Sequence, residues 1–320
     1  ALDLTDFLAE WQYKDQVNKD VLAPFIRKGH TYALPIDGYM MGLLYNKKLF
    51  QEAGLTDAQG EAKPPADWNE FVAAAKKLTN RKKGIAGFGI MGKDAEAGWG
   101  FLNWVWQAGG DFEREENGVW QAVFDSKEAV EAMEFIRDLR WRHNVLQTTL
   151  LSTSGDLSAR FGSAQIGMMF AAQDRIPGLV NQYGMKLEDI GVALLPAGPA
   201  GRANQMGGNY YILNPKSPAK VQAAAFKWIS WKILGRTEPQ RIRERGEDLR
   251  KQGQIGSLTA LPVFVGETDR KAREAAAAYK DVLVDFPDVW REAAKYMRPE
   301  PPFFCQQLYS EYLAPALQAV

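Results

Sequence analysis

The chain has 320 residues, of which 46% are hydrophobic and 24% charged, an ordinary composition for a globular protein of roughly two domains. Its 39 basic and 39 acidic residues give a formal net charge of zero. This balance excludes the basic field that binding to nucleic acid or to an anionic membrane surface needs, so we expect no nucleic-acid partner. No apolar stretch is long enough to cross a bilayer.

Cysteine and histidine are too scarce for the sites that they usually build. Cys305 is the single cysteine, which excludes an intrachain disulfide and a thiolate metal cluster. His30 and His143 are the two histidines, so a histidine-based metal site or catalytic triad has little support. We expect no metal and no cofactor.

Short apolar runs alternate with capped amphipathic segments along the first part of the chain. Residues 34–36 and 41–45 are predicted strands, and the Asn46 cap predicts that a short helix follows them. Asp67, with a glutamate three residues later, predicts the start of the next helix. This alternation is typical of an α/β fold.

The same pattern continues toward the C-terminus, where the chain becomes predominantly helical. Serine and proline residues at helix starts, and apolar residues at helical or strand spacing, mark these elements. The further predicted strands cover 85–91, 166–170 and 190–195, and the further helices begin after Ser126 and at Pro218 or cover 288–297 and 304–320.

Signals for catalysis are weak throughout the sequence. The chain lacks a glycine-rich dinucleotide fingerprint, a P-loop and a nucleophile elbow. Asp94, Glu96, Asp111 and Asp174 could supply an acidic pair for glycoside hydrolysis, but only their separation in space would identify one. We therefore expect a protein that is not an enzyme, with a carbohydrate-active enzyme as the alternative.

Aromatic residues beside polar ones are the clearest binding signal, and we predict them at loop-like junctions. Trp99 stands between two glycines, Trp104 and Trp106 follow it, and Asn209 precedes a pair of tyrosines. Aromatic faces cover the C–H faces of sugar rings, while Asp, Asn and Gln satisfy ring hydroxyls. Three other tryptophans lie in predicted helices and are interpreted as packing residues: Trp68, Trp228 and Trp231.

Five segments, read in order, resemble the maltose-binding-like family (family 1) of extracellular solute-binding proteins, the receptors of ABC sugar importers. They are residues 32–50 (YALPIDGYMMGLLYNKKLF), 64–71 (PPADWNEF), 104–112 (WVWQAGGDF), 167–170 (GMMF) and 195–201 (LPAGPAG). Each segment alone is a weak signal, and the resemblance depends on their common order over most of the chain.

The resemblance implies a two-lobed α/β fold of the periplasmic-binding-protein type (type II-like), in which a hinge closes two lobes around a ligand. We expect the first lobe to comprise 1–38 and 207–260, and the second 39–206 and 261–320. Against the family the chain also looks like a fragment without an export signal, and its first lobe is expected to be incomplete. The second lobe, mainly 42–206, is then expected to be the better-formed unit.

The resemblance also implies which residues contact the ligand. Carried over to this sequence, they are Asp37, Tyr39, Trp99, Asn103, Gly208, Asn209 and Tyr210. Two positions where the family often has an aromatic residue hold polar groups here, namely Gln173 with Asp174, and Asn209. These replacements favour a more hydrogen-bonded ligand, and Arg175 and Arg202 leave a phosphorylated ligand such as a glycerol phosphate open.

The implied function is the substrate-binding component of an ABC importer for a sugar or oligosaccharide. Its partners would be the small-molecule sugar and the permease subunits of the transporter, and the protein would be a monomer. Its location would be periplasmic, or extracellular and membrane-anchored. A receptor with a sensory rather than a transport role is a further alternative.

Overall fold

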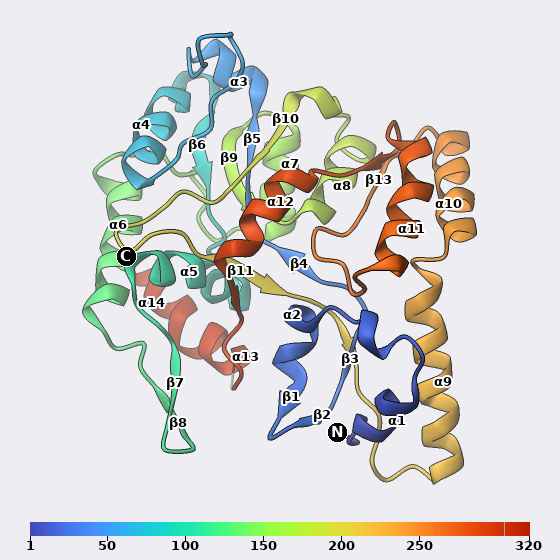
Figure 1. Cartoon of the computed structure of the whole chain (residues 1–320). Coiled ribbons are helices and arrows are strands. Elements are labelled where there is room, and N and C mark those ends of the chain that lie inside the picture. The colour runs from blue at the N-terminus through green and yellow to red at the C-terminus, as the bar shows by residue number, and fades with distance from the viewer. Residues whose placement is uncertain (304) are drawn as a thin grey trace. The chain divides into compact units, whose positions relative to one another are not determined.

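Strand β5 (Gly42–Asn46) lies in the interior of the computed structural model, which describes residues 1–303 and 305–320. It pairs antiparallel with both β9 (Ile166–Ala171) and β10 (Ile190–Ala193), and β9 pairs parallel with β6 (Ala86–Gly89). The resulting sheet has the order β10–β5–β9–β6 (Figure 1). Its strands are almost wholly buried, because helices cover them, and this explains their continuous apolar sequences.

Helices α3 (Lys47–Glu52) and α4 (Trp68–Leu78), which pack near this sheet, begin where the sequence predicts caps. Helix α3 follows β5 directly, and the Asn46 side chain accepts a hydrogen bond from the Leu49 N–H at 3.0 Å. Helix α4 packs against β6, and α7 (Ser154–Gly162) packs against β9 (Figure 1). Local capping therefore sets the helix starts, and burial of the apolar helix faces fixes the helices on the sheet.

Aromatic side chains fill the space between the sheet and its helices. Trp104 stacks on Phe170 with ring centroids 4.7 Å apart, and it meets Phe71 and Phe88 edge-on. Trp68 is buried too, as predicted for a packing residue. Trp104 is thus a core residue rather than a ligand platform.

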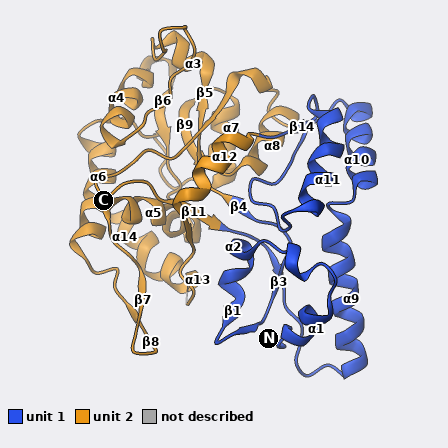
Figure 2. Ribbon diagram, in the orientation of Figure 1, with its two compact units in different colours: residues 1–39, 207–285 blue, residues 40–206, 286–320 orange. Residues whose placement is uncertain are grey.

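The chain forms two compact units, each built from two separate stretches of sequence (Figure 2). Unit 1 comprises 1–39 and 207–285, and unit 2 comprises 40–206 and 286–320. The first two crossings lie within one residue of the expected lobe boundaries. The third does not, because residues 261–285 belong to unit 1 and not to the second stretch of unit 2.

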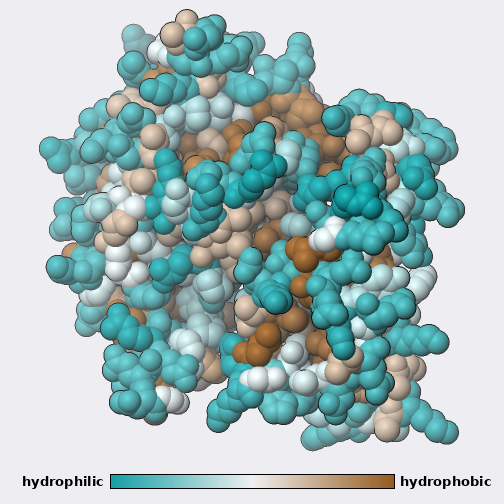
Figure 3. Space-filling model, in the orientation of Figure 1, coloured by the Kyte–Doolittle hydropathy of each residue, from teal (hydrophilic) through white to brown (hydrophobic). Residues whose placement is uncertain are grey.

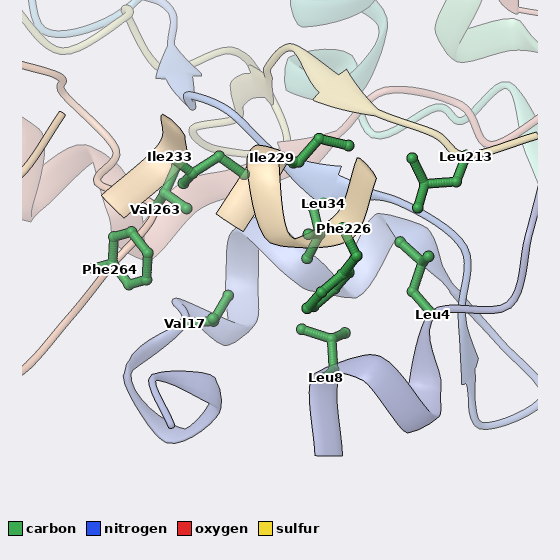
Figure 4. Packing of buried hydrophobic residues seen from close by; sticks show 10 residues of the cluster. All are labelled: Leu4, Leu8, Val17, Leu34, Leu213, Phe226, Ile229, Ile233, Val263 and Phe264. Carbon is green, nitrogen blue, oxygen red and sulfur yellow. The ribbon is translucent and has the colours of Figure 1, made fainter. Parts of the chain in front are cut away.

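The core of unit 1 explains where the third crossing falls. Helix α9 (Ala219–Gly235) begins after Pro218, as predicted. It supplies Phe226, Ile229 and Ile233 to this core. The buried cluster is shown in Figure 4 and consists of Leu4, Leu8, Val17, Leu34, Leu213, Phe226, Ile229, Ile233, Val263 and Phe264. Because Val263 and Phe264 belong to this cluster, the segment that follows them stays in unit 1.

The outer face of α9 differs from the expectation. Trp228 and Trp231 are 51% and 54% exposed, so their interpretation as packing residues is wrong. The Lys232 ammonium lies 4.8 Å from the Trp228 ring, and the Arg241 guanidinium lies 4.8 Å from the Trp231 ring. Both indoles are therefore partly covered by cations from their own unit.

The remaining elements of unit 1 are short strands and surface helices. They are α1 (Thr5–Glu10), α2 (Lys19–Leu22), β1 (Ile26–Arg27), β2 (His30–Thr31), β3 (Leu34–Pro35), β12 (Tyr210–Tyr211), α10 (Pro239–Gln252), β13 (Gly256–Ser257), α11 (Glu267–Ala276) and β14 (Leu283–Val284). Strand β3 pairs antiparallel with β12, and β13 pairs parallel with β14.

Unit 2 contains further helices, a hairpin and a second small sheet in the order β15–β11–β4. Strands β4 (Tyr39–Met40) and β11 (Asn204–Gly207) span the first two crossings, each with one residue in unit 1. The other elements are α5 (Asp94–Ala108), β7 (Glu113–Glu116), β8 (Val119–Ala122), α6 (Lys127–Trp141), α8 (Ile176–Asn181), α12 (Pro287–Ala293), β15 (Met297–Pro299), α13 (Cys305–Gln307) and α14 (Ala314–Ala319). The β7–β8 hairpin, at the lower left, is mostly hydrophilic (Figure 3).

The C-terminal segments are more broken than the sequence predicts. The predicted helix over 288–297 consists of α12 and a 3-10 turn, and the chain then enters β15. The predicted helix over 304–320 begins at residue 304, which lies outside the described residues. From Cys305 onward it is helical, with a π-helical turn, η8 (Leu308–Leu313), between α13 and α14.

Candidate ligand-binding site

In unit 1 the residues predicted to bind ligand gather at the end of β3. The Asp37 Oδ1 atom accepts hydrogen bonds from the Asn209 backbone N–H at 2.9 Å and from its side-chain amide at 3.0 Å. Pairing of β3 with β12 and a 2.7 Å hydrogen bond from the Ile36 N–H to the Asn209 carbonyl hold the two loops in this register. The second carboxylate oxygen of Asp37 lies 3.4 Å from the Arg236 guanidinium.

The two loops approach each other so closely at Gly208 that the position leaves no room for a side chain. A Cβ atom on this residue would lie 2.1 Å from the Asp37 carbonyl oxygen, far inside contact distance. A glycine at this position therefore lets the backbone before Asn209 reach Asp37.

Tyr210 supplies an accessible aromatic ring next to these polar groups. Its side chain is 51% exposed, and its ring centroid lies 4.7 Å from that of Phe25. Tyr39 stands two residues after Asp37, at the start of β4, and is partly buried. Unit 1 thus brings Asp37 together with Gly208, Asn209 and Tyr210, although Asp37 and Asn209 are 172 residues apart in sequence.

In unit 2 Trp99 lies on a helix rather than at the predicted loop-like junction. Helix α5 runs through Gly98, Trp99 and Gly100 without interruption. The Gly98 position faces the backbone of Tyr309, where an added Cβ would lie 2.4 Å from the carbonyl oxygen. The glycine therefore serves close helix packing, and Trp99 itself is partly exposed.

Asn103 lies one turn further along α5 and is fully buried. Its side-chain amide donates to Gln205 Oε1 at 3.0 Å, and its oxygen accepts from the Gln205 backbone N–H at 2.9 Å. These bonds tie α5 to β11, and contact with a ligand stays a prediction for this residue.

Gln173 and Asp174 share a 3-10 turn, Gln173–Arg175, after β9. Gln173 is buried, and its side-chain oxygen accepts a hydrogen bond from the Trp290 indole N–H. Asp174 is exposed. A ligand contact by either side chain stays a prediction.

Three residues of unit 2 that the sequence did not mark lie beside Gln173 or Trp99. Trp290 on α12 partners Gln173, and Glu300 and Tyr309 lie beside Trp99. Trp290 lay inside a predicted helix, which gave no reason to separate it from packing residues. Glu300 and Tyr309 carry no local pattern, because only the tertiary fold brings them to α5.

Two of the carboxylates considered for an acidic pair are engaged in structural contacts. Glu96 accepts hydrogen bonds from the backbone N–H and the hydroxyl of Ser154 at the start of α7. Asp111 accepts from Arg298 at 2.8 Å and from the Trp106 indole at 3.2 Å. Both carboxylates thus connect neighbouring elements of unit 2.

The other two carboxylates, Asp94 and Asp174, are exposed. Over residues 1–303 and 305–320, three or more His, Cys, Asp or Glu side chains nowhere gather as they would around a metal ion. Within the same residues, no helix combines the length and apolar character needed to cross a membrane.

The two arginines considered for a phosphate are also held by the protein. Arg202 donates to the backbone carbonyls of Ala66, at 2.9 Å, and of Leu195. Arg175 donates to the Ser154 hydroxyl at 3.1 Å, and that hydroxyl in turn donates to Glu96.

A family model described as bacterial extracellular solute-binding protein matches residues 1–231. Curated relatives from Brucella abortus and Brucella suis, named only as binding proteins, are 28% identical to the chain over 226 residues. The match covers 70% of this chain and 50% of each relative, so the chain spans about half the length of these proteins.

Solved structures share the fold over nearly the whole chain. Maltose-bound MalE3 of T. maritima has 24% identity and a TM-score of 0.71, with 99% of this chain and 75% of that chain covered. A ribitol-bound ABC transporter solute-binding protein of Agrobacterium radiobacter K84 has 22% identity and a TM-score of 0.72, covering 100% and 77%. UgpB of Mycobacterium tuberculosis, bound to glycerophosphocholine, has 20% identity and a TM-score of 0.74, covering 99% and 73%. The predicted solute-binding fold is confirmed, and the chain belongs to the family of bacterial extracellular solute-binding proteins.

Proposed function

We propose that this protein is the substrate-binding component of an ABC importer and that it captures a sugar or polyol. The observation that carries the proposal is the arrangement of Asp37, Asn209 and Tyr210 in unit 1. A carboxylate and an amide on the same two paired segments as an exposed aromatic ring supply the two kinds of contact that a polyhydroxylated ligand needs. Maltose bound to MalE3 and ribitol bound to the Agrobacterium protein support this class.

An uncharged ligand fits the site better than a phosphorylated one. Phosphate recognition usually depends on arginine forks aimed at the anion. Arg236 is paired with the Asp37 carboxylate at 3.4 Å, and Arg202 is committed to two backbone carbonyls. Arg175 lies on a hydrogen-bonded chain that ends at the Glu96 carboxylate. Glycerophosphocholine in UgpB nevertheless makes glycerol phosphates a necessary part of any binding screen.

Within this proposal each predicted residue has a role. Asp37 and Asn209 hydrogen-bond hydroxyl groups, and Gly208 keeps them in place. Aromatic contacts come from Tyr39, Trp99 and Tyr210, and further polar contacts come from Asn103, Gln173 and Asp174.

The same proposal covers partners, location and motion. The protein works outside the cytoplasm, either in the periplasm or anchored to the membrane, and delivers its ligand as a monomer to the permease subunits. Binding closes the two lobes around a hinge, because the closed state makes the better ligand contacts. Catalysis is not part of this function.

Tryptophan fluorescence during titration with monosaccharides, oligosaccharides, polyols and glycerol phosphates tests the proposal. We expect a saturable change with a sugar or polyol, and recovery of the ligand unaltered. Cleaved sugar would instead favour the carbohydrate-active enzyme, and Asp37→Asn should then abolish turnover rather than only weaken binding. Saturable binding of glycerol phosphates alone would contradict the proposed ligand class.

Substitution of the aromatic ring tests the site itself. Tyr210→Ala removes one stacking face and is expected to raise the Kd roughly three- to tenfold. The control is Tyr183→Ala, because Tyr183 is an exposed tyrosine of unit 2 outside the candidate site. An unchanged Kd for Tyr210→Ala, with binding intact, would remove Tyr210 from the site.

A further inference from the structure

One carboxylate in unit 2 accepts hydrogen bonds from two aromatic side chains. Glu300 Oε1 accepts from the Trp99 indole N–H at 3.2 Å, and Glu300 Oε2 accepts from the Tyr309 hydroxyl at 2.8 Å. Trp99 lies in α5, Glu300 directly follows β15, and Tyr309 lies in η8.

The surrounding structure holds this carboxylate in place. Strand β15 pairs parallel with β11 up to Pro299, so the residue before Glu300 is fixed by the sheet. Tyr309 is only 4% exposed and lies in the π-helical turn η8, which packs along α5 where Gly98 permits close approach. Turns of this kind are rare and are frequently found at functional sites.

We propose that Glu300 is a positioning residue that fixes the plane of the Trp99 indole for stacking on the ligand. This inference depends on the proposed function, in which Trp99 is an aromatic contact. The Trp99 indole N–H faces two acceptors of the protein, the Glu300 carboxylate and the side-chain amide of Gln205, so Trp99 offers the ligand its ring face in a set orientation. A side chain that is already oriented loses less conformational entropy on binding, which favours affinity.

The proposal extends the site beyond the part of the chain that the family model matches. That match ends at residue 231, whereas Glu300 and Tyr309 lie in the C-terminal segment. The C-terminal segment of unit 2 would then contribute to ligand affinity through Trp99 as well as to packing.

A double-mutant cycle separates positioning from a purely structural role. Glu300→Gln replaces one acceptor oxygen with an NH2 group that cannot accept, and Trp99→Phe keeps a ring but removes the indole N–H. We expect Glu300→Gln to raise the Kd for the sugar found in the screen about tenfold, as measured by calorimetry. In the Trp99→Phe background, Glu300→Gln should alter the Kd less than about twofold, because phenylalanine has no indole N–H for Glu300 to hold. An equal effect in both backgrounds, or no effect in the wild type, would overturn the proposal.

A second readout does not depend on any ligand. The near-UV circular dichroism difference between the wild type and Trp99→Phe isolates the signal of this indole. Glu300→Gln should reduce that signal, and an unchanged signal would show that Glu300 does not orient Trp99. If no compound of the screen binds while the signal falls as expected, the proposed function fails but the orienting contact stands.

Two further variants control the experiment. Glu311→Gln makes the same chemical change at an exposed residue of η8 and should alter neither the Kd nor the dichroism. Should Glu300→Gln fail to fold, Tyr309→Phe removes only the second donor to Glu300, and a smaller loss of the Trp99 signal is expected. No loss with folded Tyr309→Phe would also count against the proposal.

Discussion

Gly208 is the residue on which the polar cluster of unit 1 depends most directly. Alanine at this position would place its Cβ 2.1 Å from the Asp37 carbonyl oxygen, which belongs to the backbone and cannot rotate away. The two loops must therefore separate, and the hydrogen bonds between Asp37 and Asn209 must lengthen. We expect Gly208→Ala to lower the free energy of unfolding by about 1–3 kcal/mol and to weaken sugar binding. Denaturant unfolding and the fluorescence titration measure the two effects.

Gly178→Ala is the matched control for that substitution. Gly178 lies in α8 with an ordinary helical backbone, and an added Cβ would meet no atom within 4 Å. Alanine there should leave stability unchanged or raise it by about 0.5–1 kcal/mol. Equal stability of the two variants would mean that the loops at Asp37 tolerate separation and that Gly208 is not required.

Single residues also show how far the sequence alone could go. The spacing that places Trp68 and Trp228 in helices is equally good for both, yet Trp68 is buried and Trp228 is exposed. Composition marks Asn103 as a polar residue beside tryptophans, but its two hydrogen bonds go to Gln205 across the unit. Which side of a helix faces a neighbour is decided by tertiary contacts, and a single sequence does not contain them.

At the scale of an element, helix α5 combines a glycine with a close neighbour. Gly98 sits where the backbone of Tyr309 crosses, and a Cβ there would lie 2.4 Å from the Tyr309 carbonyl oxygen. Helix propensity favours alanine over glycine by about 0.5–1 kcal/mol, but the clash opposes it. We expect Gly98→Ala to lower the free energy of unfolding by about 1–3 kcal/mol, as measured by denaturant unfolding.

The propensity term can be measured separately in another helix of the same unit. Gly155 lies in α7, and the nearest atom to an added Cβ is the Thr153 hydroxyl oxygen at 3.6 Å. Gly155→Ala should therefore be neutral or stabilising. If Gly98→Ala stabilised the protein as well, α5 and η8 would not pack as closely as described.

Elements were predictable where local chemistry sets their ends. The side chains of Asn46, Asp67 and Ser126 each accept a hydrogen bond from a backbone N–H three residues later, as their sequences predict. Helix α5 was missed because Gly98 and Gly100 suggest a loop, while the reason for Gly98 is a neighbour more than 200 residues away. The candidate site was predictable only as separate residues, since Glu300 has no local signal.

At the scale of the whole molecule, the chain crosses between its two units three times. The first two crossings coincide with motifs that the sequence offers, at Asp37-Gly38 and at Gly207-Gly208. The third, after residue 285, follows from Val263 and Phe264 packing in the core of unit 1. No composition change marks it, so the sequence could not place it.

Each unit has its own buried core, and this predicts how damage spreads. Phe226 lies in the core of unit 1, stacked on Phe7 with ring centroids 5.1 Å apart. Phe71 lies in the core of unit 2, against Phe88 and Trp104. Removing either ring is expected to cost about 3–5 kcal/mol, because a large cavity remains.

Hydrogen exchange followed by mass spectrometry shows which unit loses amide protection in each variant. In Phe226→Ala, amides of unit 1 such as those of α9 should lose protection first, while the strands of unit 2 stay protected. Phe71→Ala should give the reverse pattern, with β6 and β9 opening and α9 protected, so each variant is the control for the other. If either variant lowered protection equally in both units, they would unfold as one cooperative body, because the three crossings would then transmit the loss of one core to the other.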